Sequence, residues 1–268
     1  MYKRMNEQLQ KEGAMALVTG ASSGIGLAYA RELARRGYDL LLVSNEQEQI
    51  GTVAEELAAA FGVKTIPLCM ALARELYQYC EREKLQIGIL VNNAGIFFFD
   101  DLTEVAPERI ETMLLLHIRT VTLLCRYFGA AMKRRRAGYI LNMSSLSAWT
   151  PAPGISVYAA SKSYIRKFSQ MLRYELHQYG VGVTTVCPGA IATGLYNLSD
   201  YYQRLALRLG VMMKPERLAR KGLRAMFARR DYILPGAVNR FFVLALYLLP
   251  VQLIYYIKEH TKLYRYGR

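Results

Sequence analysis

A tyrosine and a lysine stand four residues apart in the segment Tyr158–Lys162. On a helix, residues at this spacing share one face, so the two side chains can meet. A phenol ordinarily titrates near ~10, but a neighbouring ammonium favours the phenolate and lowers its pKa. The pair therefore predicts that Tyr158 acts as a general acid or base and that Lys162 activates it. Considered by itself, the same spacing is also typical of a solvated helix face.

A serine precedes the tyrosine by thirteen residues, at position 145. The apolar run 138–143 ends just before Ser144 and Ser145, which predicts a buried strand followed by small polar residues. A hydroxyl at the carboxyl end of a parallel strand faces the usual ligand crevice. The spacing to Tyr158 favours Ser145 over Ser144 as the hydroxyl of the site.

Three glycines, Gly20, Gly24 and Gly26, follow the apolar run 14–19. Glycines permit a tight turn and a close approach of the backbone to a ligand. A helix that begins near Ile25 would present free N–H groups and its positive end to a pyrophosphate. The segment therefore predicts a cradle for a dinucleotide.

Four motifs in this order resemble the short-chain dehydrogenase/reductase family over residues 12–195. They are Thr19-Gly20-Ala21-Ser22-Ser23-Gly24-Ile25-Gly26, Asn92-Asn93-Ala94-Gly95, the Tyr158/Lys162 pair and Pro188-Gly189-Ala190-Ile191-Ala192-Thr193. The resemblance implies an α/β fold of a single domain with a doubly wound parallel sheet, the Rossmann fold. It also implies an oxidoreductase that uses NAD or NADP.

The resemblance assigns roles to the residues that match the family's motifs. Ser145 would hydrogen-bond the substrate oxygen, Tyr158 would move the proton, and Lys162 would lower the tyrosine pKa and hold the nicotinamide ribose. The residues expected to contact the cofactor are Gly20, Ser22, Ser23, Gly24, Ile25, Gly26, Asn45, Asn93, Ala94, Gly95, Tyr158, Lys162, Pro188, Gly189, Ile191 and Thr193.

The end of the second apolar run, 38–43, is where the choice between NAD and NADP is expected. An acidic residue there would hold the ribose hydroxyls of NAD, and an arginine would accept the extra phosphate of NADP. Ser44 and Asn45 provide neither device, and the absence of a carboxylate at these positions favours NADP, with NAD left open. Met70 stands where the family usually has an aspartate that touches the adenine.

His117 departs from the family's pattern, which places an asparagine twenty-four residues after the second Asn of Asn92-Asn93-Ala94-Gly95. In the family this asparagine holds a water that connects the lysine to solvent. An imidazole also accepts and donates hydrogen bonds, and near its reference pKa of ~6.5 it can exchange protons. We therefore include His117 among the predicted catalytic residues, with a hydrogen-bonded core histidine as the alternative. Phe97-Phe98-Phe99 is expected to be either ordinary core or a wall of the nicotinamide pocket.

Apolar runs at 14–19, 38–43, 65–70, 85–91, 138–143 and 181–186 are expected to form six parallel strands. Helices are expected at 25–36, 107–132 and 214–230. With 268 residues, 53% of them hydrophobic, the chain is long enough for one α/β domain. We divide it into a dinucleotide-binding and catalytic core at 1–195, a substrate lid at 196–235 and an apolar and basic extension at 236–268. The four cysteines are scattered without metal-ligand spacing and are expected to be buried thiols, so no metal site is predicted.

The net charge of +14 is concentrated near the carboxyl end. Residues 200–268 hold fourteen Lys or Arg against four Asp or Glu, which indicates an anionic partner. The apolar stretch 238–257 is interrupted too often to span a bilayer, and the sequence favours a position in the membrane interface. The alternative is a dimer interface or a lid helix. Nucleic acid is not favoured, because no nucleic-acid-binding motif accompanies the charge.

The leading interpretation is an oxidoreductase that reduces a ketone, or oxidises the alcohol, of a bulky apolar and lipid-like substrate. The aromatic and methionine-rich segment 196–213 suits such a ligand, and lipid metabolism is its expected setting. The alternative is a catalytically silent homologue that acts as a nucleotide-binding or membrane-associated scaffold. A cytoplasmic protein is expected, either free or at the cytoplasmic face of a membrane, because no apolar segment of a signal peptide follows the amino terminus. The family resemblance implies a homodimer or homotetramer.

Overall fold

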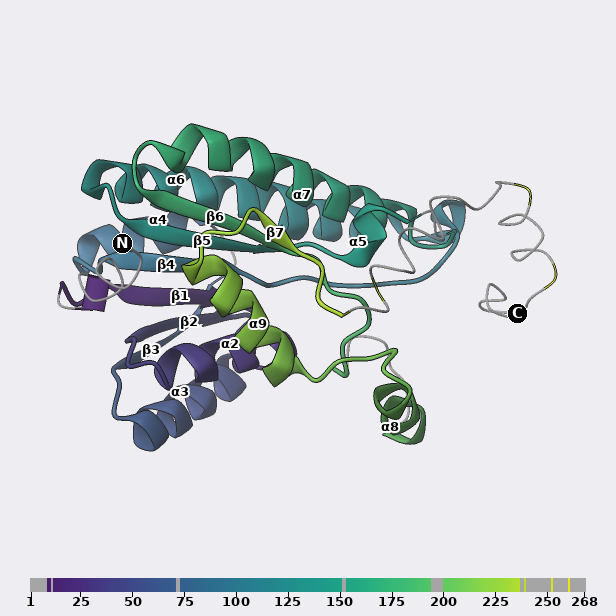
Figure 1. The fold of residues 1–268 in the computed structure, drawn as a ribbon, viewed down its shortest axis with the longest axis horizontal. Helices are drawn as coiled ribbons and strands as arrows, with labels where there is room; N and C mark the ends of the chain where they lie inside the picture. The colour runs from purple at the N-terminus through teal and green to yellow at the C-terminus, as the bar shows by residue number, and fades with distance from the viewer. Residues whose placement is uncertain are drawn as a thin grey trace.

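A parallel sheet of seven strands forms the centre of the protein (Figure 1). The computed structural model describes residues 9–10, 12–70, 73–150, 153–193 and 200–236, and the single positions 239, 252 and 260. The strand order is β3-β2-β1-β4-β5-β6-β7, so the chain winds outward in both directions from β1 and β4. This confirms the predicted doubly wound sheet in a single domain. The strands are β1 Met15–Thr19, β2 Leu40–Ser44, β3 Thr65–Cys69, β4 Ile87–Asn92, β5 Gly138–Met143, β6 Val181–Val186 and β7 Tyr232–Ile233.

Six of these strands were expected, and β5 and β6 begin and end at the expected residues. The other boundaries differ by at most two residues. The seventh strand, β7, pairs in parallel with Thr185 and Val186 at the edge of the sheet. It was missed because two residues are too few to show an alternation of apolar and polar side chains.

Helices cover both faces of the sheet (Figure 1). One layer contains α2, α3 and α9, and the other contains α4, α6 and α7. The long helices of the two layers are α2 Gly24–Ala34, α3 Gln47–Phe61, α4 Ala73–Arg82, α6 Val121–Arg135, α7 Ser156–His177 and α9 Pro215–Phe227. Shorter helical segments are η1 Leu102–Glu104, α5 Pro107–Leu114, η2 Leu115–Thr120, η3 Leu146–Ala148 and α8 Asp200–Arg208.

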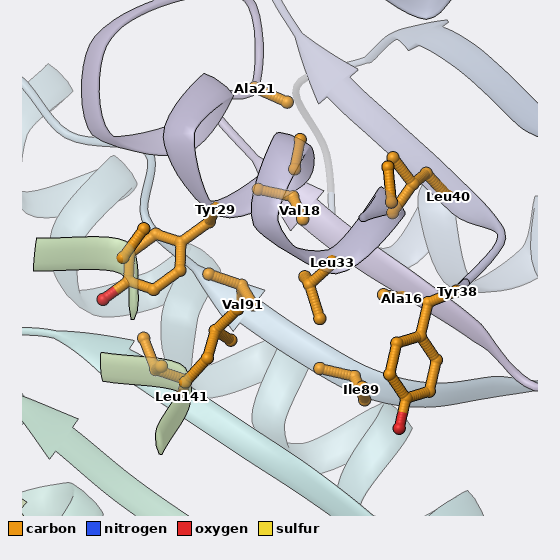
Figure 2. Close-up of a cluster of buried hydrophobic side chains, with 14 of the residues drawn as sticks. Ala16, Val18, Ala21, Tyr29, Leu33, Tyr38, Leu40, Ile89, Val91 and Leu141 are labelled. Carbon is orange, nitrogen blue, oxygen red and sulfur yellow. The ribbon is translucent and has the colours of Figure 1, made fainter. Parts of the chain in front are cut away.

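Alternate residues of each central strand pack into different cores, because side chains alternate across a strand. In β1, Ala16 and Val18 belong to the core under α2, α3 and α9, whereas Met15 and Leu17 belong to the core under α4, α6 and α7. Figure 2 shows the first of these cores, where Tyr29 and Leu33 of α2 approach residues of the central strands. Both faces of the strands are therefore buried, which explains their nearly continuous apolar sequences.

The helix expected at 107–132 is continuous but not uniform. It starts as α5, widens into the π-helical turn η2, and continues as α6 to Arg135. A π-helical turn closes hydrogen bonds one residue further along than an α-helix, and such turns occur often at functional sites. His117 lies within this turn and is fully buried.

The segments beyond the core are described only in part. The expected helix at 214–230 is α9, and most of the extension at 236–268 lies outside the described residues. Within the described lid residues, α8 and the turn after it expose apolar side chains, namely Tyr201, Leu205, Leu209 and Val211. No helix in the described part of the chain is long and apolar enough to span a membrane. Cys69 is exposed, against expectation, because it lies in the edge strand β3.

Helices α2 and α9 pack closely at Gly222. A Cβ atom built on this glycine would collide with the hydroxyl of Tyr29, which is fully buried. Tyr29 in turn donates a hydrogen bond of 3.4 Å to Sδ of Met143, at the end of β5. The absence of a side chain at Gly222 therefore keeps α2 in place against the end of the sheet.

We expect Gly222→Ala to lower the free energy of unfolding by about 1–3 kcal/mol, because the new methyl group overpacks a buried aromatic side chain. Gly51 in α3 is a matched control, since a Cβ there meets nothing within 4 Å. Gly51→Ala should instead raise the free energy of unfolding by up to about 1 kcal/mol through helix propensity. Urea denaturation followed by circular dichroism measures both effects, and equal changes in the two variants would contradict the packing argument.

Candidate active site

One cavity lies at the carboxyl ends of β1, β4, β5 and β6 and is closed on one side by α7. Most of the predicted site residues line it, although they come from distant parts of the sequence. The lining residues are Ile25, Asn93, Gly95, Ile96, His117, Met143, Ser144, Ser145, Tyr158, Lys162, Pro188, Gly189, Ile191 and Thr193. This is the crevice where parallel α/β sheets bind their ligands.

The glycine turn between β1 and α2 has little space for side chains. Gly20 has a φ of +64°, and a Cβ there would lie 2.9 Å from Cα of Ala94. A Cβ on Gly26 would collide with the carbonyl oxygen of Gly20. These two glycines are therefore required for the turn to lie against the loop after β4.

The amino terminus of α2 has the properties of an anion site. Its N-cap residue, Ser23, makes no side-chain hydrogen bond to the helix, and the first turn contains no acidic residue. The first N–H groups of a helix have no partner within it and carry a partial positive charge. The terminus therefore fits the pyrophosphate of a dinucleotide.

Asn93 fastens the loop after β4 to the glycine turn. Its Nδ2 donates to the carbonyl oxygens of Thr19 at 3.0 Å and Gly20 at 3.3 Å. In the other direction, the backbone N–H groups of Asn93 and Ala94 donate to Oγ1 of Thr19, each at 3.0 Å. The segment 188–193 also contacts the glycine turn, since a Cβ on Gly24 would lie 3.3 Å from Cγ2 of Thr193.

Tyr158 and Lys162 lie on the same face of α7, as their spacing predicts. Both are buried, and Nζ of Lys162 lies 5.5 Å from the centre of the Tyr158 ring. The same Nζ donates to the carbonyl oxygen of Met143 at 3.3 Å. Burial lowers the pKa of Lys162 to about 8. A charge held in a buried site acts strongly on a neighbouring phenol, because little water screens it.

The two serines after β5 differ in what their hydroxyl groups contact. Oγ of Ser144 is buried and donates to the backbone carbonyl of Lys162 at 2.7 Å, so it holds α7 against β5. Oγ of Ser145 accepts a hydrogen bond of 3.1 Å from the N–H of Ser147. Among the described residues, none accepts a hydrogen bond from the Ser145 hydroxyl. The geometry is therefore consistent with Ser145 as the donor to a substrate oxygen.

His117 is held by hydrogen bonds at both ring nitrogens. Nε2 accepts from the N–H of Ile96 at 3.1 Å, so the ring proton is assigned to Nδ1. Nδ1 lies 2.9 Å from Oγ of Ser161, which donates at 2.7 Å to the backbone carbonyl of Tyr158. Burial, together with the charge of Lys162, lowers the pKa of His117 to about 2. This geometry favours a neutral positioning residue over the proton exchange near ~6.5 that the sequence also allowed.

Phe97 packs edge-on against Tyr158, with ring centres 5.0 Å apart and an interplanar angle of 90°. The ring of His117 also contacts Tyr158, with ring centres 5.8 Å apart and an interplanar angle of 71°. Two rings therefore pack edge-on against the phenol of Tyr158. Neither Phe97 nor Phe98 is among the residues that line the cavity, and both pack in the small core around Tyr158, which favours the core alternative.

Some predicted cofactor residues lie outside the cavity, and some lining residues were not predicted. Gly20, Gly24, Gly26 and Ala94 form its support, while Ser22, Ser23 and Asn45 lie further along the turn after β1 and at the end of β2. Ile96 and Met143 line the cavity unpredicted, although each is next to a recognised motif. The more consequential omission is Glu46, whose carboxylate accepts a hydrogen bond of 2.9 Å from Oγ of Ser22. Its only signal was its place two residues after a strand.

Sequence comparisons identify the family. A family model described as short chain dehydrogenase matches residues 14–200. The very-long-chain 3-oxoacyl-CoA reductase of Anas platyrhynchos is 36% identical over 196 residues, which cover 70% of this chain and 62% of that protein. The human inactive hydroxysteroid dehydrogenase-like protein 1 is 33% identical over 203 residues, which cover 73% of this chain and 61% of that protein. The matches span about three fifths of the length of these curated relatives.

Comparison with solved structures gives the same result for the fold. A short-chain dehydrogenase from Sphingobium yanoikuyae in complex with NADPH superposes with a TM-score of 0.76 at 27% identity. The match covers 95% of this chain and 98% of that one.

Within the described residues, no group of three or more His, Cys, Asp or Glu side chains is arranged to hold a metal ion.

The lowered pKa of His117 predicts a pH dependence of stability. The unfolded imidazole titrates near ~6.5, whereas the folded one has a pKa of about 2. Between these values the unfolded state binds one more proton, so the contribution of His117 to stability is complete above ~6.5 and declines as the pH falls. Relative to His117→Asn, the wild type should lose up to about 1.4 kcal/mol of unfolding free energy per pH unit below ~6.5.

Urea denaturation at several pH values between about 5 and about 7 measures this difference. His177→Asn is the control, since His177 is exposed at the end of α7. A difference between wild type and His117→Asn that stays constant with pH would contradict the assignment of a neutral, buried imidazole.

Proposed function

The chain belongs to the short-chain dehydrogenase family, and from that premise we propose that it is an NAD(P)-dependent oxidoreductase. It reduces a ketone, or oxidises the corresponding alcohol, of a bulky apolar substrate. The observation that carries this proposal is the common cavity of Ser145, Tyr158 and Lys162 beside the amino terminus of α2. The cavity thereby brings a proton donor and its activating cation next to a dinucleotide cradle, so that substrate and nucleotide can bind side by side.

The mechanism follows from the contacts of these side chains. Ser145 donates a hydrogen bond to the substrate oxygen and orients it. Tyr158 gives its proton to that oxygen during reduction and takes it back during oxidation. Lys162, buried beside the phenol, stabilises the phenolate that remains. Ser144 keeps α7 in position by its bond to the backbone carbonyl of Lys162, and His117 does so by its bond to the hydroxyl of Ser161.

The residues present fit a nicotinamide dinucleotide. The amino terminus of α2 and its glycine turn would hold the pyrophosphate, and the segment 188–193 lines the same cavity beside Tyr158. When bound, the nicotinamide ring supplies or accepts the hydride. The protein contributes alignment, and it places a charge next to the group that moves the proton.

The apolar and lipid-like nature of the substrate rests on the surroundings of the cavity. Ile96 and Ile191 line it, and Phe97 packs against Tyr158. The relative named very-long-chain 3-oxoacyl-CoA reductase supports a long aliphatic substrate, and with it a role in lipid metabolism. A cytoplasmic location, a membrane contact through residues 236–268 and a homodimer or homotetramer stay predictions.

A catalytically silent nucleotide-binding or scaffold protein is the second candidate. It is favoured by the relative whose name describes it as inactive, at 33% identity. Against it stands the geometry of Ser145, Tyr158 and Lys162, since a scaffold has no need of an ammonium buried against a phenol. The two candidates share a fold and a cradle, so turnover distinguishes them.

Turnover should be detectable with the purified full chain, NADH or NADPH, and a panel of bulky ketones that includes long-chain 3-oxoacyl thioesters and steroid ketones. The loss of nicotinamide absorbance measures it. Tyr158→Phe should lower kcat about 10²- to 10⁴-fold, because it removes the proton donor, while nucleotide binding is retained. Nucleotide binding without turnover in the wild type would favour the silent candidate. Absence of nucleotide binding would overturn both.

Ser145→Ala and Ser144→Ala form a matched pair for the assignment of the substrate hydroxyl. Each variant loses one hydrogen bond, so both should lose about 1 kcal/mol of stability. Only Ser145→Ala should lower kcat about 10²- to 10³-fold, as the removal of a donor to a developing oxyanion does. Steady-state kinetics and thermal unfolding together test this, and a larger kinetic loss in Ser144→Ala would reverse the assignment.

A further inference from the structure

Helix α8 stands apart from both helix layers (Figure 1). None of its described side chains belongs to the hydrophobic cores of the described part of the chain. Tyr201, Leu205 and Leu209 are spaced four residues apart, so they share one face of the helical turn, which the bond from the N–H of Leu209 to the carbonyl of Leu205 continues. They are 65%, 41% and 67% exposed, and Val211 in the next turn is 54% exposed. These four residues form an apolar stripe on the surface.

The turn after α8 is fixed to the rim of the cavity. The N–H of Met213 donates to the carbonyl oxygen of Ala190 at 3.1 Å, and the carbonyl oxygen of Met213 accepts from the N–H of Ala192 at 3.0 Å. Between Ala190 and Ala192 lies Ile191, which lines the cavity. Met212 is buried, so the turn is anchored on its inner side. The apolar stripe is therefore attached at its carboxyl end to the rim of the candidate active site.

Positive charges border the stripe. Arg204 and Arg208 are exposed, and each directly precedes a leucine of the stripe, so they lie about 100° around the helix from it. Lys214 is exposed beyond the turn, and residues 201–214 contain no Asp or Glu. A helix with an apolar face and a basic edge suits the surface of an anionic bilayer, because the basic side chains reach the headgroups while the apolar ones enter the acyl boundary. The stripe and these three cations are called the α8 surface below.

We propose that the α8 surface docks the protein on a lipid bilayer with anionic headgroups. The apolar stripe enters the boundary between headgroups and acyl chains, and the three cations lie among the headgroup phosphates. Because the turn after α8 is attached to the rim of the cavity, this contact holds the cavity close to the lipid. The α8 surface is separate from the extension 236–268, for which the sequence predicted a membrane contact. The inference goes beyond the proposed function and does not depend on the reaction.

Two other occupants fit the α8 surface less well. A second copy of this chain related by a two-fold axis would bring the same patch against itself, so like charges would meet. Four partly exposed side chains also supply much less than the ~800 Å² that each partner of a stable protein interface buries. The extension 236–268 does not complement the charge either, because it contains Arg240, Lys258, Lys262, Arg265 and Arg268 against Glu259. An anionic bilayer complements both the apolar and the basic part.

Flotation of the full-length protein with lipid vesicles tests the proposal. The wild type should float with vesicles of phosphatidylcholine and phosphatidylserine, and less with phosphatidylcholine alone, because the cations need anionic headgroups. Leu205→Ser combined with Leu209→Ser should weaken binding to the mixed vesicles at least about 10-fold. Arg204→Gln combined with Arg208→Gln should weaken it about 5-fold for each arginine removed. Failure of the wild type to float, or unchanged binding in both double variants, would overturn the inference.

A matched pair of tyrosines controls for the loss of an exposed aromatic side chain. Tyr201 is 65% exposed and Tyr174 is 64% exposed. Tyr174 lies sixteen residues after Tyr158 in α7, which places it roughly 24 Å along the helix from the cavity. Tyr201→Ser should weaken binding to the mixed vesicles at least about 3-fold, and Tyr174→Ser should leave it unchanged. Equal losses in the two variants would contradict the assignment to α8.

A polarity-sensitive dye shows whether the α8 surface itself meets lipid. Cys69 is exposed and the other three cysteines are buried, so Cys69→Ser combined with Val211→Cys leaves one accessible thiol for the dye. Its emission should shift to the blue on the mixed vesicles. Flotation without this shift would assign the membrane contact to another part of the chain and overturn the inference.

The same dye distinguishes the other occupants. Blue-shifted emission without vesicles that grows with protein concentration would indicate a second copy of the chain. Blue-shifted emission without vesicles at every concentration would indicate another segment of the same chain. Either result would overturn the inference and leave the proposed function intact, because turnover tests that function separately.

Discussion

The site depends on an ammonium that is buried beside a phenol. Nζ of Lys162 lies 5.5 Å from the centre of the Tyr158 ring and donates a hydrogen bond to the carbonyl oxygen of Met143. Removing a cation from water is costly, and this cost appears as the lowered pKa of the lysine. The helix that carries the lysine is held in place by two contacts: Ser144 joins α7 to the end of β5, and Ser161 joins α7 to His117 of η2.

The buried site of Lys162 tolerates a neutral histidine at position 117 but does not tolerate a second positive charge. A protonated imidazole so near Lys162 would repel the ammonium, and His117 has no exposed surface through which water could screen it. With the proton on Nδ1, His117 instead connects the loop after β4 to the helix that carries Tyr158. The imidazole thereby links two parts of the site while adding no charge.

The motifs that depend on local spacing could be predicted from the sequence, and these include the glycine turn, the Tyr158/Lys162 pair and the strands with continuous apolar runs. Features that depend on contacts between residues far apart in the sequence could not be predicted in this way. Glu46 differs from any exposed glutamate only through its contact with Ser22, twenty-four residues away. Likewise, the different contacts of Ser144 and Ser145 arise from the directions that their side chains take at the end of β5.

The π-helical turn η2 changes which neighbours the continuous helix formed by α5 and α6 contacts before and after the turn. Met113, before the turn, packs with Tyr158 and Phe98, whereas Val121, Leu124 and Phe128, after it, pack against the sheet. A π-helical turn uses more residues per revolution than an α-helix, so it changes the helical phase between the two segments. One continuous helix thus contributes side chains to two separate cores, and His117 lies in the turn that joins its two segments.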